Sequence, residues 1–280
     1  MANYKNLIRV MVSGPRACFT RPEFKTERVS YEVPTPSALE GFLKCIYWKP
    51  AFKYVIDKIV VFNPIRTACI KRNELKNKIP VSRVMKTIEG KPVDLHIYTE
   101  EVSERAQRTT TVLKNVMYGI EFHIEMSGCM AFHDGEGIQK HLEIFHKRMD
   151  TGRVFKEPYF GCSEFLADRW ELVDSFPTEK IHESLKGTRC PGTMLYGMKF
   201  PIEKPAEDSE EGWKKQVWSD NAKSIYYTPL MVNGVIGTVF VQVYERGDFS
   251  VCISFRRDIA LRQQYVVIVF YKFFNKHQTA

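Results

Sequence analysis

The clearest hydrophobic pattern in the sequence predicts an amphipathic helix near the amino terminus. Its apolar positions recur at i, i+3, i+4 and i+7, at Leu39, Phe42, Leu43 and Ile46, and so form one stripe. Thr35 supplies an N-cap hydroxyl, and Pro36 suits the first helical position because no N–H is needed there. The pair Lys49-Pro50 ends the helix, since the residue before a proline is disfavoured in the α region.

Alternating apolar and polar residues predict strands over 7–13 (ended by Gly14-Pro15), 54–62, 109–126 and near Tyr159–Phe160. A second amphipathic helix is predicted over 137–149. The resulting order, strand-helix-strand-strand-helix-strand, is that of a ferredoxin-like α+β fold with an antiparallel sheet and two helices on one face. We assign this domain to residues 1–186.

The remaining third of the chain predicts a small antiparallel β-domain over residues 187–280. Its signals are a strand at 193–200 and a hairpin around Asn233-Gly234, a favoured dipeptide of tight hairpin turns. The segment 163–186, at the end of the first domain, has a partly helical pattern. An acidic loop follows within 201–212.

The polar stretch from Lys71 to Arg108 has neither a helical nor a strand period. Loops of this length inside compact domains are usually functional or mobile. Two interpretations stay open, a solvated face and a loop that contacts nucleic acid.

Composition adds a preference for a polyanionic partner. The 280 residues carry a formal net charge of +8, with a pI near 9.0 and 13% aromatic residues. Basic side chains neutralise phosphates and aromatic rings stack on bases, although a merely basic soluble protein has the same composition. The seven cysteines form no CxxC pair, which argues against a zinc cluster and for reduced thiols in a cytoplasmic protein. No signal peptide or membrane span is predicted.

Candidate chemistry centres on Tyr47, at the end of the first helix, and on Lys140-His141, in the first turn of the second. Sequence motifs of nucleotide, zinc-protease and calcium sites are missing, and we expect neither a metal nor a cofactor. If both helices cover one face of the sheet, these side chains can approach one another. Histidine can act as a general acid or base, and a lysine can neutralise charge on a phosphate. By spacing alone, a surface position for Lys140 and His141 is the commoner outcome.

Four stretches resemble the CRISPR-associated RAMP proteins of the Cas-five class, type I-C subtype. They are residues 13–50, the IQKHLEIFHKR segment (138–148), EPYFGCSEF (157–165), and GTMLYGMKFP with the following VWSD (192–201 and 217–220). Two features depart from the family pattern. Ser163 stands where many members have an arginine, and the tail from about Gly237 differs.

The resemblance implies a metal-independent endoribonuclease that cuts CRISPR repeat RNA at the base of its hairpin and stays on the 5′ handle. It implies Tyr47, Lys140 and His141 as catalytic residues. The partners expected are the repeat RNA or guide RNA, other subunits of a type I-C effector complex, and double-stranded DNA, with no membrane. The candidate RNA-binding cations are Arg16, Arg21, Lys25, Arg28, Lys44, Lys49, Arg108 and Arg153.

Two other functions stay open. The same fold and basic surface would serve a non-catalytic subunit that caps the 5′ end of a guide RNA. An ordinary RRM-like protein is less favoured, because residues 116–124 lack the basic-Gly-aromatic start of an RNA-binding strand.

Overall fold

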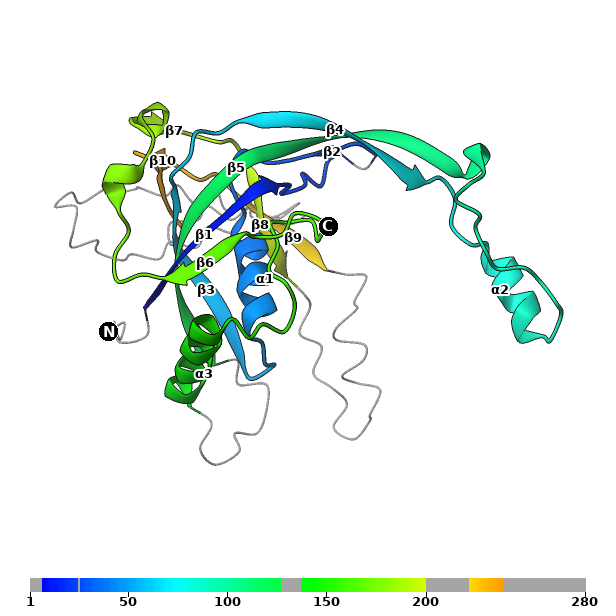
Figure 1. Ribbon diagram of the computed structural model, residues 1–280, viewed down its shortest axis with the longest axis horizontal. Coiled ribbons are helices and arrows are strands. Elements are labelled where there is room, and N and C mark those ends of the chain that lie inside the picture. The colour runs from blue at the N-terminus through cyan, green and yellow to red at the C-terminus, as the bar shows by residue number, and fades with distance from the viewer. Residues whose placement is uncertain (1–6, 25, 127–136, 200–221, 239–280) are drawn as a thin grey trace, which may run out of the picture.

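The computed structural model describes residues 7–24, 26–126, 137–199 and 222–238. Its main sheet has the strand order β6 (Arg169–Leu172), β1 (Ile8–Ala17), β5 (Arg105–Met126), β3 (Phe52–Val61), β11 (Val235–Gly237), β10 (Met231–Val232) and β7 (Thr188–Arg189). Figure 1 shows helices that pack against the body of the sheet and a long arm that projects from it. Among the described residues, no helix has the length and apolarity that crossing a bilayer requires.

Four antiparallel strands make the centre of the main sheet. They are β1 (Ile8–Ala17), β3 (Phe52–Val61), β5 (Arg105–Met126) and β6 (Arg169–Leu172). β5 pairs with both β1 and β3, and β6 adds to the free side of β1. The expected α+β class with a large antiparallel sheet is therefore confirmed.

The first helix, α1 (Pro36–Ile46), forms as predicted. The Thr35 hydroxyl accepts a hydrogen bond from the Ala38 N–H at 3.2 Å, and Pro36 begins the helix. Its buried stripe faces the core, with Leu39, Phe42, Leu43 and Ile46 all at most 1% exposed. Burial of four such side chains contributes roughly 6–12 kcal/mol before the entropy of ordering them is subtracted. The core thus fixes the axis of α1 and the place where it ends.

The second predicted helix is α3 (Ile138–Thr151), with Gly152 at its end in the left-handed region (φ 64°). Leu142, Phe145 and Met149 are buried against the sheet as expected, whereas Ile138 stays 37% exposed. Because α1 and α3 bury their stripes in one hydrophobic core, the end of α1 meets the start of α3.

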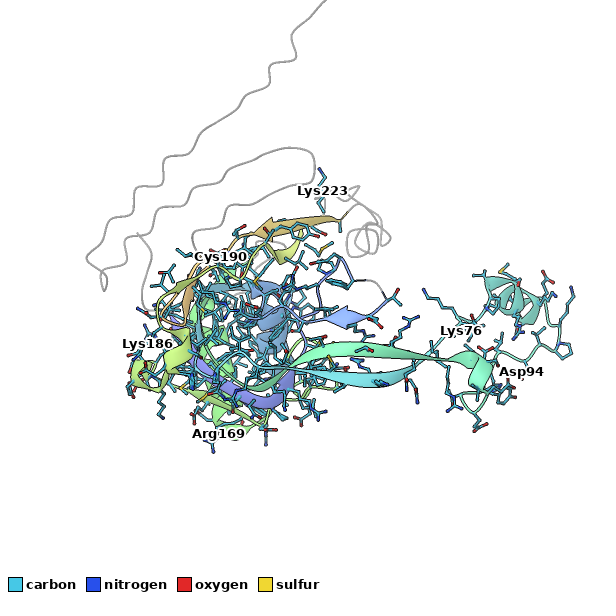
Figure 2. The ribbon with its side chains drawn as sticks, turned by 90° about the horizontal axis from the view of Figure 1, so that it is seen from above. Lys76, Asp94, Arg169, Lys186, Cys190 and Lys223 are labelled. Atoms are coloured by element: carbon cyan, nitrogen blue, oxygen red, sulfur yellow. The ribbon has the colours of Figure 1, made fainter. Side chains whose placement is uncertain are left out.

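The polar stretch 71–108 is largely exposed but is not structureless throughout, and its contact with nucleic acid stays a prediction. β4 (Thr67–Leu75) pairs with the first half of β5 over nine residues, and the short β2 (Arg28–Val29) lies on the other side of β5. This ribbon forms the arm, which carries α2 (Val81–Ile88) and the 3₁₀ turn η2 (Val102–Glu104) at its outer end. Lys76 and Asp94 lie there, away from the body of the molecule (Figure 2).

Several boundaries differ from prediction. β1 continues through Gly14-Pro15 to Ala17, because this segment still pairs with β5. Tyr159 forms only an isolated bridge to Leu166, and the fourth central strand is β6, ten residues later. The described segment 163–186 is not helical beyond two 3₁₀ turns, η3 (Thr178–Lys180) and η4 (Glu183–Leu185).

The EPYFGCSEF segment (residues 157–165) packs an aromatic ring against α1. Phe160 is 1% exposed and stacks on Phe42, with ring centroids 5.2 Å apart. Gly161 has a φ of 80°, and a Cβ there would lie 2.0 Å from the Cys18 carbonyl oxygen. Only glycine fits this close approach. Ser163 is exposed on the same turn.

The later strands are β7 (Thr188–Arg189), β8 (Met194–Lys199), β9 (Lys223–Tyr227), β10 (Met231–Val232) and β11 (Val235–Gly237). The predicted hairpin turn is confirmed, since Asn233 and Gly234 both have positive φ between β10 and β11. β11 pairs with β3 and so extends the main sheet, while β8 and β9 form a two-stranded sheet of their own. The division into domains at residue 186 stays a prediction. The acidic loop expected within 201–212 lies outside the described residues.

Candidate active site

Tyr47 occupies the C-cap of α1 and leaves the helix in an extended conformation (φ −150°, ψ 132°). Its N–H still donates to the Leu43 carbonyl at 3.1 Å, so the last turn of α1 fixes its position. The side chain is 4% exposed and points into the core rather than to solvent. The helix thus ends at Ile46, before the stop at Lys49-Pro50 that the sequence predicts.

The Tyr47 hydroxyl lies 3.0 Å from Nδ1 of His141, and the two side chains form a buried hydrogen bond. His141 is completely buried in the first turn of α3. Which partner donates depends on the imidazole tautomer: a hydroxyl that donates to Nδ1 leaves the ring proton on Nε2. The two residues are 94 positions apart in the chain. The structure therefore brings together two of the three predicted catalytic residues.

Aromatic and cationic neighbours hold this pair in place. The ring of Phe52 lies 4.8 Å from the imidazole and 5.4 Å from the Tyr47 ring. The guanidinium of Arg148 stands 5.0 Å above the Tyr47 ring, and its Nη1 donates to the Ile46 carbonyl at 2.8 Å. Tyr54 donates its hydroxyl proton to the Tyr47 carbonyl at 2.7 Å. The pair thus has little freedom to change its orientation.

Sequence reasoning missed these supporting residues. Arg148 could have been found from helical periodicity, because it lies seven residues after His141 and therefore on the same face of α3, two turns away. The sequence pattern identifies Phe52 and Tyr54 less specifically. They alternate along β3 on its buried side, but so does every core residue of that strand.

Lys140 differs from its neighbour in being exposed. Successive helical residues point about 100° apart, so the side chain that precedes a buried histidine turns toward solvent. Lys140 lies in the first turn of α3, where free N–H groups favour negative charge. Of the predicted catalytic residues, it is the one that solvent reaches.

The geometry suits proton transfer and charge neutralisation, with one condition. A tyrosine hydroxyl and an imidazole in hydrogen-bond contact can pass or hold a proton, and an exposed lysine beside a helix N-terminus can bind a phosphate. Since His141 has no exposed surface, neighbouring side chains must move before a phosphate ester can contact it. In the described part of the chain, histidine, cysteine and carboxylate groups do not gather into a cluster that could bind a metal ion.

The predicted RNA-binding cations fall into different settings. Arg28 and Arg108 lie at the base of the arm and share the carboxylate of Glu74, at 3.4 and 3.3 Å. Lys44 pairs with Glu40 at 2.8 Å along α1. These three charges are at least partly neutralised within the protein.

Arg21 stacks over the ring of Tyr31 at 4.9 Å and lies 3.8 Å from Glu23. Arg16 and Arg153 are exposed, and Lys49 is half-buried. Lys25 lies outside the described residues. The structure does not gather the seven described cations into one surface: they lie on or just after β1, on or just after α1, on the arm and on the segment after α3.

Arg72 was not singled out by the sequence, yet it is the innermost cation of the arm. Its side chain is 14% exposed and contacts Glu164 and Glu74, which links the arm to the EPYFGCSEF turn. Its position opposite Arg108 in the β4–β5 register could not be seen without the pairing of those strands.

Comparison with known proteins places this geometry in context. Residues 7–235 match a model of the Cas5d family of CRISPR-associated proteins. The chain is 43% identical over 198 residues to a CRISPR pre-crRNA endoribonuclease, Cas5d, of Mannheimia succiniciproducens, which covers 70% of this chain and 86% of that protein. It is 39% identical over 160 residues to the protein of the same name from Thermus thermophilus, covering 57% of this chain and 62% of that protein.

Solved structures agree on the fold. The crystal structure of a CRISPR-associated protein matches with a TM-score of 0.53 at 22% identity, over 82% of this chain and 90% of that one. A functionally uncharacterized protein from Streptococcus mutans also matches with a TM-score of 0.53, at 21% identity over 82% and 91% of the two chains.

Proposed function

The chain belongs to the Cas5d family of CRISPR-associated proteins, and we propose that it is an endoribonuclease that processes CRISPR precursor RNA. Two relatives at 43% and 39% identity carry that activity in their names. The observation in this chain that supports the proposal most is the buried hydrogen bond between Tyr47 and His141. It joins two residues predicted as catalytic from separate motifs.

We infer a ferredoxin-like core for the amino-terminal part. Supporting this inference, the central strands follow the spatial order β6-β1-β5-β3 with antiparallel pairing throughout. The helix α1 connects β1 to β3, and α3 connects β5 to β6. That is the chain order strand-helix-strand-strand-helix-strand, with β4 and α2 inserted as the arm.

The proposed cleavage is an internal transesterification. The RNA 2′-oxygen bonds to the adjacent phosphorus as its hydroxyl proton departs, and the bond from phosphorus to the 5′-oxygen breaks as that oxygen gains a proton. His141 has the chemistry for one of these proton transfers, and Tyr47 orients its imidazole. Lys140 and the free N–H groups of α3 neutralise charge that builds on the phosphate. Solvent accepts or supplies the other proton, and the roles given to these side chains need no metal ion or cofactor.

As in the family it resembles, we propose that the protein cuts repeat RNA near the base of its hairpin and keeps the 5′ handle as a subunit of an effector complex. The candidate binding cations are those that project to solvent, Arg16 and Arg153 among them. The chain's net charge of +8 supports a polyanionic ligand.

One observation favours the alternative of a non-catalytic cap on the guide RNA. His141 is completely buried, and a histidine that never meets the RNA would serve packing alone. The Tyr47–His141 bond would then stabilise the junction of α1 and α3 and nothing more.

Incubation of the protein with its cognate repeat RNA in EDTA distinguishes the two functions. The endoribonuclease produces one discrete cut with a 2′,3′-cyclic phosphate end on the upstream fragment. A protein that binds the RNA tightly but leaves it intact for hours at protein concentrations far above Kd is the cap instead.

A further inference from the structure

Three cations stand side by side where the arm leaves the main sheet. Arg16 on β1 lies directly opposite Lys114 on β5. The N–H of Lys114 donates to the carbonyl of Arg66 at 2.9 Å, so Arg66 lies beside it on the other side of β5. Arg66 directly precedes β4, whose first residue pairs with Leu113. We call these three residues, Arg16, Lys114 and Arg66, the cation row.

Within the described residues, no carboxylate neutralises the positive charges of the cation row. All three side chains are exposed, and within the described residues none of them forms an ion pair with a carboxylate. Like charges directly opposite on neighbouring strands destabilise a sheet. Such a row is retained at a cost to the free protein, a cost that a bound anion removes.

A second cation group on the same arm shows the contrast. Arg28, Arg72 and Arg108 surround Glu74, whose carboxylate lies 3.4, 3.9 and 3.3 Å from the three guanidinium groups. Arg72 contacts Glu164 as well. These arginines hold the base of the arm together, whereas the cation row leaves its charges to solvent.

A small hollow lies next to the row. Arg66 and Lys114 line a hollow together with Asn63 and Asn115. The backbone of Asn115 is in the left-handed region (φ 49°), and its carbonyl accepts a hydrogen bond from the Asn63 amide at 2.8 Å. This turn bends β5 at the point where β3 gives way to β4 as its partner.

A carboxylate also lines this hollow. Glu32 lies there, but Arg189 on β7 pairs with it at 2.7 Å. The surroundings of the row therefore keep an excess of positive charge.

We propose that the cation row binds consecutive phosphates of the repeat RNA backbone, an inference that rests on the proposed function. Neighbouring strands are about 4.8 Å apart, so the row extends roughly 10 Å across the sheet. Long basic side chains at this spacing reach successive phosphates of one RNA strand. A guanidinium can donate two hydrogen bonds to the same phosphate. The row anchors the RNA backbone at the corner of the sheet and contributes affinity without base readout.

The test compares two variants that each remove three positive charges. The row variant carries Arg16→Gln, Lys114→Gln and Arg66→Gln. The control carries Lys147→Gln, Arg169→Gln and Lys180→Gln, three exposed cations outside the row; Arg169 lies on the body of the molecule, away from the arm (Figure 2). The probe is cognate repeat RNA with 2′-O-methyl groups throughout, which cannot be cleaved through its 2′-oxygen. Binding is measured by fluorescence anisotropy between 50 and 300 mM salt.

The expected result follows from counterion release. Three lost phosphate contacts reduce the slope of log K against log salt by about 2 and weaken binding on the order of 100-fold near 0.1 M salt. The control variant stays within about threefold of the wild type. Circular dichroism and thermal unfolding of each variant show whether it is folded. If the row variant unfolds, the three single substitutions are measured instead, each with an expected slope change of about 0.7.

Equal affinities of the two triple variants would overturn the proposal. So would a loss confined to duplex DNA of the same sequence, which would assign the row to DNA. Failure of the proposed function is a separate outcome. A wild-type protein that never cuts unmodified repeat RNA, but whose row variant loses affinity, leaves the row in place and removes the nuclease.

Discussion

The junction of α1 with α3 and the corner of the main sheet, where the arm leaves it, hold their polar side chains in opposite ways. At the junction, Tyr47 and His141 are buried, bonded to each other and surrounded by aromatic rings. At the corner, the cation row is exposed, and its members face one another with no carboxylate between them among the described residues. The first arrangement holds its atoms in fixed positions, as the proposed chemistry requires, whereas the second leaves charge available for the proposed binding.

This difference shows how one sheet can serve both proposed tasks. Helix packing in the core gives positional precision, which proton transfer needs. Strand pairing at the edge of the core gives regular spacing, which a polymer of phosphates can match. We therefore expect changes at the junction to alter the rate of cleavage and changes at the corner to alter affinity.

The largest expected effect is that of His141→Ala on cleavage. Loss of a general acid or base lowers the rate of the chemical step by about 10²–10⁴-fold. Affinity for the 2′-O-methyl repeat RNA stays within about threefold of the wild type, because the side chain is buried away from the binding surface. Single-turnover cleavage at saturating protein provides the measurement. His146→Ala, an exposed histidine on the same helix, is the matched control and keeps the wild-type rate.

A smaller effect is expected from Tyr47→Phe, which keeps the ring but removes the hydroxyl. The imidazole of His141 loses the partner at Nδ1, so we expect a rate about tenfold lower and a loss of about 1–3 kcal/mol of unfolding free energy. Tyr54→Phe is the control, since it removes a hydroxyl that bonds to the Tyr47 carbonyl and leaves the Tyr47–His141 bond in place. Equal cleavage rates for the two variants at a temperature where both are folded would contradict the orienting role of Tyr47.

Thr35→Ala tests whether α1 acts only as a support. The substitution removes the N-cap hydrogen bond to Ala38 and costs about 1 kcal/mol. Urea unfolding should show this loss, while cleavage well below the melting temperature stays unchanged. Thr87→Ala on the exposed helix α2 is the control and shifts unfolding free energy by less than about 0.5 kcal/mol. A slower cleavage by folded Thr35→Ala would show that the start of α1 influences its far end.

The smallest effect is expected from replacing His123 by glutamine, which should alter the pH dependence of stability and leave RNA binding unchanged. Carboxylates of the protein already neutralise the charge of this histidine. Its Nδ1 lies 2.6 Å from the Asp57 carboxylate, and Nε2 lies 3.3 Å from Glu125. The hydrogen bond to Asp57 raises the pKa of His123 above its ordinary value. The stability it contributes is therefore fully present below about pH 6.5, the unfolded value, and is lost as pH rises through the folded pKa.

Unfolding free energy measured from pH 5 to pH 9 checks this sign. The difference between the wild type and His123→Gln should be largest at the acidic end and shrink as the pH rises. Binding of the 2′-O-methyl repeat RNA should be equal for the two proteins at each pH. A difference in stability that grows with pH would show that His123 is stabilised as the neutral imidazole.

Local signals in the sequence predicted the parts of the fold that the core determines. The stripe of α1, its N-cap at Thr35 and the turn at Asn233-Gly234 depend on neighbouring residues and were found. β4 was missed because its inward residues include Arg72 and Glu74, which pair with charges from β2 and the EPYFGCSEF turn instead of entering an apolar core. A ribbon stabilised by ion pairs has no hydrophobic period to detect.

The candidate site was predictable in part for a similar reason. Tyr47 and His141 were identified through family motifs, since 94 residues separate them and no spacing rule connects them. The complete burial of His141 was not foreseen. Of the cation row, the sequence analysis identified Arg16 alone. Arg66 and Lys114 become its neighbours only through the register of β1, β5 and the start of β4.

The central claim, that cleavage and anchoring reside in separate regions, is tested most directly by a double-mutant cycle. The saturating single-turnover rate and the Kd for repeat RNA are measured for the wild type, His141→Ala, the row variant and the two combined. We predict that His141→Ala lowers the rate alone, that the row variant raises Kd alone, and that the combined protein shows both changes unaltered. A row variant that lowers the saturating rate as strongly as His141→Ala, or a His141→Ala protein that loses affinity as strongly as the row variant, would contradict the account.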